Sequence, residues 1–370
     1  MSDNRNGAGG PLRAHLVGHE KAAQTLRKCW AEQRLHHAWC LSGPKGIGKA
    51  TLAWQFAYFL LERGGSGGHG KASLFGEALP VEVPESITID QDSQLFRRLQ
   101  AGTHGNLMVV ERGLDPKSGR ARSEIIVDDV RRLSQFYSKT AAEEGWRIAI
   151  IDSADELNRN ASNALLKTLE EPPDRSILLL IAHSPGRLLA TIRSRCQDLP
   201  LLPLSERQTR KVLAHYYPDL AEAEAKGLAV LAEGAPGLAI SLAGEGGLDL
   251  YGRMVELLAA LPSIPTSRLF ALVDDIALRD QPDRPLFFAG LLRNWLGRAI
   301  RARVVGVEPY EVVAGEGDQQ ARLLAAMPLD RWIEVWEKMG RLISRTEALN
   351  LDRRQLVFGL FRTMESALAS

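Results

Sequence analysis

The residues whose types and spacing suggest chemistry begin with a glycine-rich stretch, GPKGIGKAT, that runs from Gly43 to Thr51. An apolar run precedes this stretch and a helical pattern follows it, and its spacing fits the phosphate-binding pattern G-x-x-x-x-G-K. Backbone N–H groups of such a loop surround phosphate oxygens, and the lysine reaches the β- and γ-phosphates. The sequence therefore predicts a nucleotide-binding loop formed by Gly43, Gly46, Gly48, Lys49, Ala50 and Thr51.

Two positions depart from the pattern of a hydrolysing site. The residue after the lysine is normally Ser or Thr, whose hydroxyl ligates Mg²⁺, but here it is Ala50. Thr51 comes one place later and is therefore rotated by about 100° around the helix. Asp152 ends an apolar run where a magnesium-holding acid belongs, yet Ser153 stands where a water-activating glutamate would follow. We expect weak or vestigial ATP binding, Mg²⁺ only together with the nucleotide, and little hydrolysis.

The triplet Ser194-Arg195-Cys196 follows an apolar run and a short helical connection. An arginine at such an edge can be presented to a neighbouring subunit, where an arginine finger contributes roughly 10³ to 10⁵ in rate. The alternative is that Arg195 pairs with a carboxylate of its own chain. Taken alone, the triplet favours this local pairing.

Composition limits the class of protein. The 370 residues predict two or three domains, and shares of 45% hydrophobic and 25% charged residues are ordinary for a globular protein. A formal net charge of +1 gives no global attraction to nucleic acid or membrane, so any DNA contact must come from a local patch or from partner subunits. Lys117, Arg120 and Arg122 lie in a basic turn that has the charge to meet phosphates, but the sequence favours a solvated turn.

Cysteine usage and the lack of apolar segments point to a protein of the cytoplasm. The three cysteines, Cys29, Cys40 and Cys196, have no paired spacing, which argues against disulfides and structural zinc and fits a reducing compartment. The first residues have no apolar core, and no run of about 20 apolar residues is present to span a bilayer. We expect a soluble cytoplasmic protein without membrane partners.

Short apolar runs alternate with helical patterns in the first half of the chain. Three of them, His37–Leu41, Arg147–Ile151 and Ser176–Ala182, are continuous, as in strands of a parallel sheet that is buried on both faces. The fold class expected for this part is α/β. Residues 1–15 are Gly/Asn-rich and are predicted to be a flexible tail, and residues 16–203 form the predicted core.

After residue 203 the strand signal disappears. Residues 204–245 give three helical patterns, broken at Pro218 and at Gly234–Gly237, and predict a small helical lid. Residues 246–370 are helical again, with broad apolar faces of the kind found in an internal core. Because Trp and Tyr are enriched at interfaces, part of these faces is alternatively a subunit interface.

Together these residues resemble the bacterial DNA polymerase III clamp-loader family, within the AAA+ ATPases. The specific segments are LVGHE, LHHAW before the glycine-rich loop, IIVDDVRRL, NALLKTLEEPP and the SRC triplet, and weaker ones are GAPG and NLDRRQ. The resemblance covers residues 16–203 with specific motifs. The NALLKTLEEPP stretch and the SRC triplet are the most telling, because generic P-loop proteins lack that combination.

The resemblance implies a RecA-like parallel sheet core, a small helical lid and an all-α collar through which five subunits form a ring. It implies partners: gamma/tau motor subunits that hydrolyse ATP, the delta subunit that opens the sliding clamp, and primed DNA reached through the hetero-oligomeric complex. Arg195 is implied to be the arginine offered to a motor's ATP site. The chain is then part of the DNA-directed DNA polymerase holoenzyme, a nucleotidyltransferase complex, with no polymerase active site of its own.

Departures from the family pattern sharpen the expectation. No cysteine occupies residues 64–75, where many members carry a four-cysteine zinc module, so no zinc is expected. Gly237 stands where motor subunits place an arginine that contacts the γ-phosphate. Together with Ala50 and Ser153 this favours a non-hydrolysing subunit. The alternatives are an active motor of the gamma/tau kind, a small-molecule kinase, and a purely structural module with a vestigial loop.

Overall fold

The computed structural model describes residues 10–64, 86–115, 119, 122–138, 143–277, 283–308, 310–349 and 351–369. The chain divides into two compact units. The sheet unit comprises residues up to 219 together with 233–240, and the helical unit comprises 220–232 together with 241–370. Among the described residues, no helix is long and apolar enough to cross a membrane.

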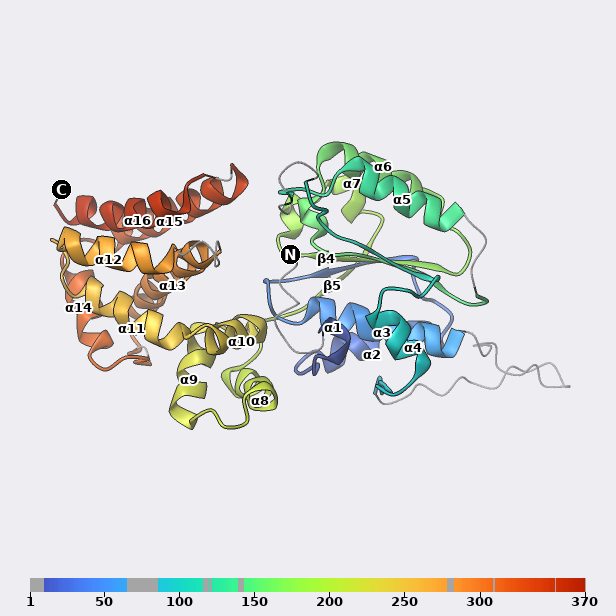
Figure 1. Ribbon diagram of the computed structural model, residues 1–370, viewed down its shortest axis with the longest axis horizontal. Coiled ribbons are helices and arrows are strands. Elements are labelled where there is room, and N and C mark those ends of the chain that lie inside the picture. The colour runs from blue at the N-terminus through green and yellow to red at the C-terminus, as the bar shows by residue number, and fades with distance from the viewer. Residues whose placement is uncertain are drawn as a thin grey trace, which may run out of the picture. The chain divides into compact units, whose positions relative to one another are not determined.

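A five-stranded sheet organises the sheet unit (Figure 1), and all of its pairings are parallel, in the order β2-β3-β4-β1-β5. The strands are β1 (Ala38–Ser42), β2 (Leu107–Val110), β3 (Arg147–Ile151), β4 (Ser176–Ala182) and β5 (Gln197–Pro200). The central strands β1 and β4 are buried at every position, and β3 at all but its first, as expected when helices cover both faces. The α/β expectation is confirmed, and no bounds were predicted for the edge strands β2 and β5.

Helices cover both faces of this sheet. One face carries α1 (Gly10–Arg13), α2 (Glu20–Ala31), α3 (Lys49–Gly64) and α4 (Gln94–Gln100), and the other carries α5 (Val127–Ser138), α6 (Arg159–Glu170) and α7 (Ala190–Arg193) (Figure 1). Two short 3₁₀ turns, η1 (Ala154–Glu156) and η2 (Pro185–Arg187), follow β3 and β4. Separate apolar cores fill the two sides: Phe56 of α3 belongs to one, and Leu165 of α6 to the other.

The ends of α6 follow from its sequence. The side chain of Asn158 accepts a hydrogen bond from the N–H of Ala161 at 2.9 Å and caps the first turn. The helix ends at Glu170 because Pro172 and Pro173 follow after one intervening residue. Proline supplies no N–H to continue the helix, and it disfavours helical backbone in the residue before it. The glutamate is therefore fixed at the helix end.

The predicted N-terminal tail is too long. Residues 10–13 form α1, and Leu12 is buried against Tyr58, Phe96 and Leu99. Gln55 of α3 also donates a hydrogen bond to the carbonyl of Ala14 at 3.0 Å. The burial of Leu12 and the hydrogen bond to the carbonyl of Ala14 hold this segment on the sheet unit. The Gly/Asn-rich composition of the segment does not indicate either contact. Residues 1–9 lie outside the described part, as do 65–75 of the segment expected to lack zinc.

Three helices occupy the predicted lid: α8 (Glu206–Tyr216), α9 (Glu222–Leu231) and α10 (Pro236–Gly244). The two compact units divide them differently from the predicted boundary, because residues 220–232 group with the C-terminal helices. Contacts of α9 explain this grouping. The side chain of Asn294 donates to the carbonyl of Leu231 at 3.4 Å, and Lys226 lies 4.2 Å from the ring centroid of Tyr310.

The helical unit continues with α11 (Gly247–Leu258), α12 (Thr266–Ile276), α13 (Arg284–Val305), α14 (Glu316–Ala325), α15 (Leu329–Ala348) and α16 (Arg353–Leu368). Its largest fully buried side chains are Tyr251, Phe288, Trp295, Trp332 and Phe361. Both tryptophans belong to the apolar faces noted in the sequence. Their burial supports the interpretation of these faces as internal core.

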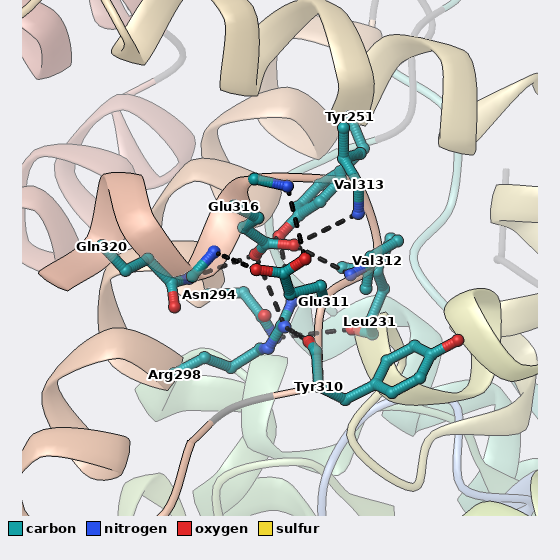
Figure 2. Close-up of polar contacts among 12 residues, drawn as sticks. Leu231, Tyr251, Asn294, Arg298, Tyr310, Glu311, Val312, Val313, Glu316 and Gln320 are labelled. Carbon is teal, nitrogen blue, oxygen red and sulfur yellow. Dashed lines mark hydrogen bonds and ion pairs between the residues drawn. The ribbon is translucent and has the colours of Figure 1, made fainter.

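A buried polar cluster holds the loop between α13 and α14 (Figure 2). Glu316, which is 1% exposed, accepts a hydrogen bond from the N–H of Val312 at 3.0 Å and one from the hydroxyl of Tyr251. Arg298, which is 7% exposed, lies 3.4 Å from the carboxylate of Glu316 and donates to the carbonyl of Tyr310 at 2.7 Å. One ion pair thus joins α11, α13, α14 and the loop.

Candidate nucleotide site and arginine edge

The glycine-rich loop leaves the carboxyl end of β1 and leads into α3, as predicted. Gly43, Gly46 and Gly48 all have positive φ angles, of 141°, 80° and 107°, which side chains rarely allow. At Gly43 a Cβ would also lie 2.4 Å from the carbonyl oxygen of Leu201, so no other residue fits. The loop is therefore built on backbone conformations that only glycine adopts at no cost.

A histidine at the start of α2 contacts the backbone of this loop. His19 is buried, and its Nε2 lies 2.6 Å from the carbonyl oxygen of Ile47. Because a carbonyl only accepts, Nε2 must carry the proton and donate it. Burial lowers the pKa of His19, which favours this neutral form. His19 belongs to the LVGHE segment, whose sequence gave no hint of this contact.

Lys49 lies across its own loop. Its ammonium group is 2.6 Å from the carbonyl oxygen of Gly43 and 2.6 Å from that of Pro44, and the residue is 2% exposed. Burial lowers the pKa of Lys49 to about 8, against the opposing attraction of Asp155 and Asp152. The two carbonyls use two of the three N–H donors of the ammonium, and the third remains for another acceptor such as a phosphate oxygen.

The start of α10 packs directly on the tip of the loop. The N–H of Gly237 donates to the carbonyl oxygen of Gly46 at 2.8 Å. A Cβ at Gly237 would lie 3.0 Å from that same oxygen, which is closer than side chains normally come. The position at which motor subunits are expected to carry an arginine is thus a point of backbone contact in this chain, and a larger residue requires the contact to shift.

The carboxyl end of β3 carries Asp152 and then Ser153, as the sequence indicated. Ser153 has a left-handed backbone, with φ of 62°, and its hydroxyl lies 3.2 Å from Nε2 of His183. The N–H of Asp152 donates to the carbonyl of Val110 on β2 at 2.9 Å. A hydroxyl paired with an imidazole therefore occupies the place at which a water-activating carboxylate is needed.

Asp155 is a site residue whose role the sequence did not reveal. It lies in the short turn η1, outside the sheet. However, its two carboxylate oxygens accept hydrogen bonds from the backbone N–H groups of His183 and Ser184, both at 3.0 Å. Asp155 therefore joins the ends of β3 and β4 beside Lys49, whose charge it favours.

Ala50 and Thr51 follow Lys49 at the start of α3. Ala50 is half-buried and offers no ligand, and Thr51 is buried in the first turn of α3. Across the ranges that the structure describes, no group of three or more His, Cys, Asp or Glu side chains is arranged to hold a metal ion.

Arg195 lies at the opposite edge of the sheet from the glycine-rich loop. It precedes β5, whereas Gly43 follows β1, and the two strands run parallel with Trp39 opposite Gln197. In a parallel sheet the starts of strands lie at one edge and their ends at the other. Arg195 is therefore placed away from the nucleotide loop of its own chain.

The local carboxylate that the sequence left open as an alternative is present. Nη2 of Arg195 lies 2.9 Å from Oε1 of Glu170, the last residue of α6. Nη1 donates to the carbonyl oxygen of Thr191 at 3.0 Å. The arginine side chain is 37% exposed and the glutamate side chain 52% exposed, so the pair is open to solvent.

The solvated basic turn is wrong for one of its three residues. Arg122 is partly buried, and its Nη2 lies 3.2 Å from both carboxylate oxygens of Asp129 on α5. Asp129 also pairs with Arg132 and accepts from the N–H of Ile126, so its charge is held by several partners. Lys117 and Arg120 lie outside the described residues.

Comparison with known proteins gives a consistent result. Residues 18–205 match the family model described as "DNA polymerase III, delta subunit". The chain is 36% identical over 221 residues to the DNA polymerase III subunit delta′ of Pseudomonas aeruginosa, a match that covers 60% of each chain. It is 34% identical over 179 residues to the same subunit of Bacillus subtilis, covering 48% of this chain and 45% of that protein. Less than two thirds of each relative's length is matched.

Two further similarities concern proteins named tau and gamma. The DNA polymerase III subunit tau of Escherichia coli is 28% identical over 317 residues, which are 80% of this chain and 44% of that protein. A solved structure of a gamma subunit-related protein from Thermotoga maritima is 15% identical, with a TM-score of 0.43, over 94% of this chain and 99% of its own. The assignment of an α/β fold therefore rests on the observed parallel sheet and not on this structural similarity.

Proposed function

This chain belongs to the delta-prime family of DNA polymerase III clamp-loader subunits, and from that premise we propose that it is a stator of the clamp loader. In this role it does not hydrolyse ATP itself. It supplies Arg195 to the ATP site of a neighbouring motor subunit, where the guanidinium stabilises charge that develops on the transferred phosphate.

The proposed partners are the gamma/tau motor subunits and delta, in a cytoplasmic hetero-oligomer. Through this complex the chain helps to load the sliding clamp on primed DNA. Matches to both delta-prime and tau proteins support a place among clamp-loader subunits. The collar through which the subunits associate is proposed to be the helical unit.

The observation that carries the proposal is the position of Arg195. It precedes β5, at the edge of the sheet opposite the loop that follows β1, so it does not serve the nucleotide loop of its own chain. It is also partly exposed, with a side chain 37% accessible. This placement favours an arginine that acts on the ATP site of a neighbouring subunit.

The chain's own nucleotide site supports a stator in a complementary way. Gly237 packs on the loop tip where motor subunits are expected to place an arginine, Ala50 offers no hydroxyl for Mg²⁺, and Ser153 replaces the water-activating acid. Removing one electrostatic contact to a transition state costs about 3 to 4 kcal/mol, so the loss of several leaves negligible turnover. The glycines and Lys49 remain, and weak nucleotide binding is compatible with the proposal.

An active motor of the gamma/tau kind is the second candidate. The observation that favours it is the match to tau over 80% of this chain. It requires that a carboxylate from another position activate water, because Ser153 stands where that carboxylate is normally found.

The test is ATP binding and turnover by the purified chain, alone and with primed DNA. We expect no turnover above that of a Lys49→Ala variant, whether or not ATP binds. If the chain hydrolyses ATP at a rate typical of motor subunits and Lys49→Ala abolishes this activity, the stator proposal is wrong and the motor proposal takes its place. Because Lys49 is buried, circular dichroism of the variant must first show that it folds.

A further inference from the structure

Among the residues that the structure describes, Glu170 is the carboxylate that pairs with Arg195, and neither the sequence motifs nor the family comparison assigns it a role. It ends α6, and its Oε1 lies 2.9 Å from Nη2 of Arg195. The helix stops there because of the two prolines that follow, so the position of Glu170 is set independently of the arginine.

The guanidinium of Arg195 is held from two sides. Nη1 donates to the carbonyl oxygen of Thr191 at 3.0 Å, one helical turn earlier, while Nη2 pairs with Glu170. The hydroxyl of Ser194 lies 3.5 Å from Nη1 and adds a weak third contact. A planar group that is held through both of its terminal nitrogens has a defined plane, although the side chain is flexible.

The strength of the pair decides what it can do. Both side chains are more than one third exposed, at 37% and 52%. Exposed ion pairs shift an equilibrium by a factor of only about two to five, and salt weakens them further. Glu170 therefore orders the arginine without sequestering it from a phosphate, which binds a guanidinium through stronger charge-assisted hydrogen bonds.

We propose that Glu170 is a positioning residue for Arg195, which it holds in the orientation that meets the phosphate of a neighbouring subunit. The inference rests on the proposed role of Arg195 as an arginine finger. Ordering the guanidinium before the neighbour's ATP reacts means that less flexibility is lost in the transition state. Loss of Glu170 then lowers turnover and leaves the affinity of the motor for ATP unchanged.

The test uses the chain assembled with the motor and delta subunits of its own organism, and compares steady-state ATP hydrolysis. Glu170→Ala is expected to lower kcat by a factor of about two to five with an unchanged KM. Glu170→Gln, whose amide oxygen still accepts a hydrogen bond, is expected to fall between this variant and the parent. Glu171→Ala is the matched control, because it removes the same charge from the next, exposed residue.

Several outcomes would overturn the positioning role. These are an unchanged or higher kcat for Glu170→Ala, an equal loss for Glu171→Ala, or a loss for Glu170→Gln as large as that for Glu170→Ala. Size-exclusion chromatography confirms that each variant assembles.

Arg195→Ala separates this inference from the function on which it rests. If Arg195→Ala leaves turnover unchanged, the arginine finger and the positioning role both fail. If Arg195→Ala abolishes turnover while Glu170→Ala has no effect, the finger stands and only Glu170 is wrongly assigned. In the Arg195→Ala background, Glu170→Ala is expected to add no further loss, since the two residues act as one unit.

Discussion

Two arginine–glutamate pairs, one in each compact unit, show how burial changes the use of the same two side chains. Arg298 and Glu316 in the helical unit are 7% and 1% exposed, and further hydrogen bonds surround both (Figure 2). Arg195 and Glu170 in the sheet unit are 37% and 52% exposed. The buried pair fixes a loop and three helices, whereas the exposed pair leaves its arginine available to another anion.

The physical reason is desolvation. A charge inside the protein has given up water, so removing its partner leaves an uncompensated charge. An exposed charge keeps much of its hydration and loses little when its partner leaves. We therefore expect mutations of the buried pair to act on stability, and mutations of the exposed pair to act on function.

The largest expected effect is that of Arg195→Ala on turnover in the assembled complex. An arginine finger contributes roughly 10³ to 10⁵ in rate, and we expect ATP hydrolysis by the neighbouring site to fall by about 10³ or more. The unfolding free energy of the Arg195→Ala chain should differ from that of the parent by less than about 1 kcal/mol, since the pair with Glu170 is exposed. Hydrolysis assays and urea titrations check the two halves. A large loss of stability would mean that Arg195 is structural.

Removal of the buried carboxylate has the next largest effect. Glu316→Ala leaves Arg298 without its counter-charge and the hydroxyl of Tyr251 and the N–H of Val312 without an acceptor. We expect a loss of about 3 to 5 kcal/mol, measured by hydrogen exchange of the α11, α13 and α14 amides. Glu311→Ala removes an exposed carboxylate from the same loop, which accepts hydrogen bonds from the N–H groups of Gly315 and Gly317, and should cost about 0.5 to 2 kcal/mol. Equal effects of the two would contradict the comparison.

Lys49 is a buried cation of a third kind, held by carbonyls and with no ion pair among the described residues. Its pKa in the folded chain is about 8, below the value of 10.5 that applies in the unfolded chain. Between these two pH values the unfolded chain binds more protons, so stability rises with pH; below pH 8 the cost of burying the charge is fully present. We expect a rise of about 1 to 3 kcal/mol over this range.

The pH effect is measured as the difference between the parent and Lys49→Met, since other lysines and tyrosines titrate in the same range. The methionine variant keeps the bulk of the side chain and removes the charge. It should lack this rise and be more stable than the parent below pH 8. Parallel pH profiles for the two chains would show that the two carbonyls fully compensate the buried ammonium.

The smallest expected effect is that of Glu170→Ala on stability. We expect the unfolding free energy to fall by less than about 1 kcal/mol, and the difference from the parent to shrink as salt is raised. Urea unfolding at low and high ionic strength measures both. A loss as large as that for Glu316→Ala would end the contrast between the pairs.

Much of the sheet unit was predictable because its central strands are continuous apolar runs. Such runs gave the bounds of β3 and β4 and, within one residue, those of β1. No bounds were predicted for the edge strands because both are four residues long and only partly buried, and QDLP of β5 also carries polar side chains. The boundary of the lid was not predictable either, because contacts from distant helices hold α9.

The sequence by itself determined which chemical groups are present: the glycines and Lys49 of the loop, Ala50 and Ser153 where a hydroxyl and a carboxylate are missing, and the arginine of the SRC triplet. Local patterns carry this information because each depends on a few neighbouring residues. Only the tertiary structure decided their partners. Ser153 meets His183 from 30 residues away, and Arg298 meets Tyr251 from 47 residues away. Such contacts arise from the packing of elements. Only the fold therefore placed Arg195 at the end of the sheet opposite the glycine-rich loop and beside Glu170.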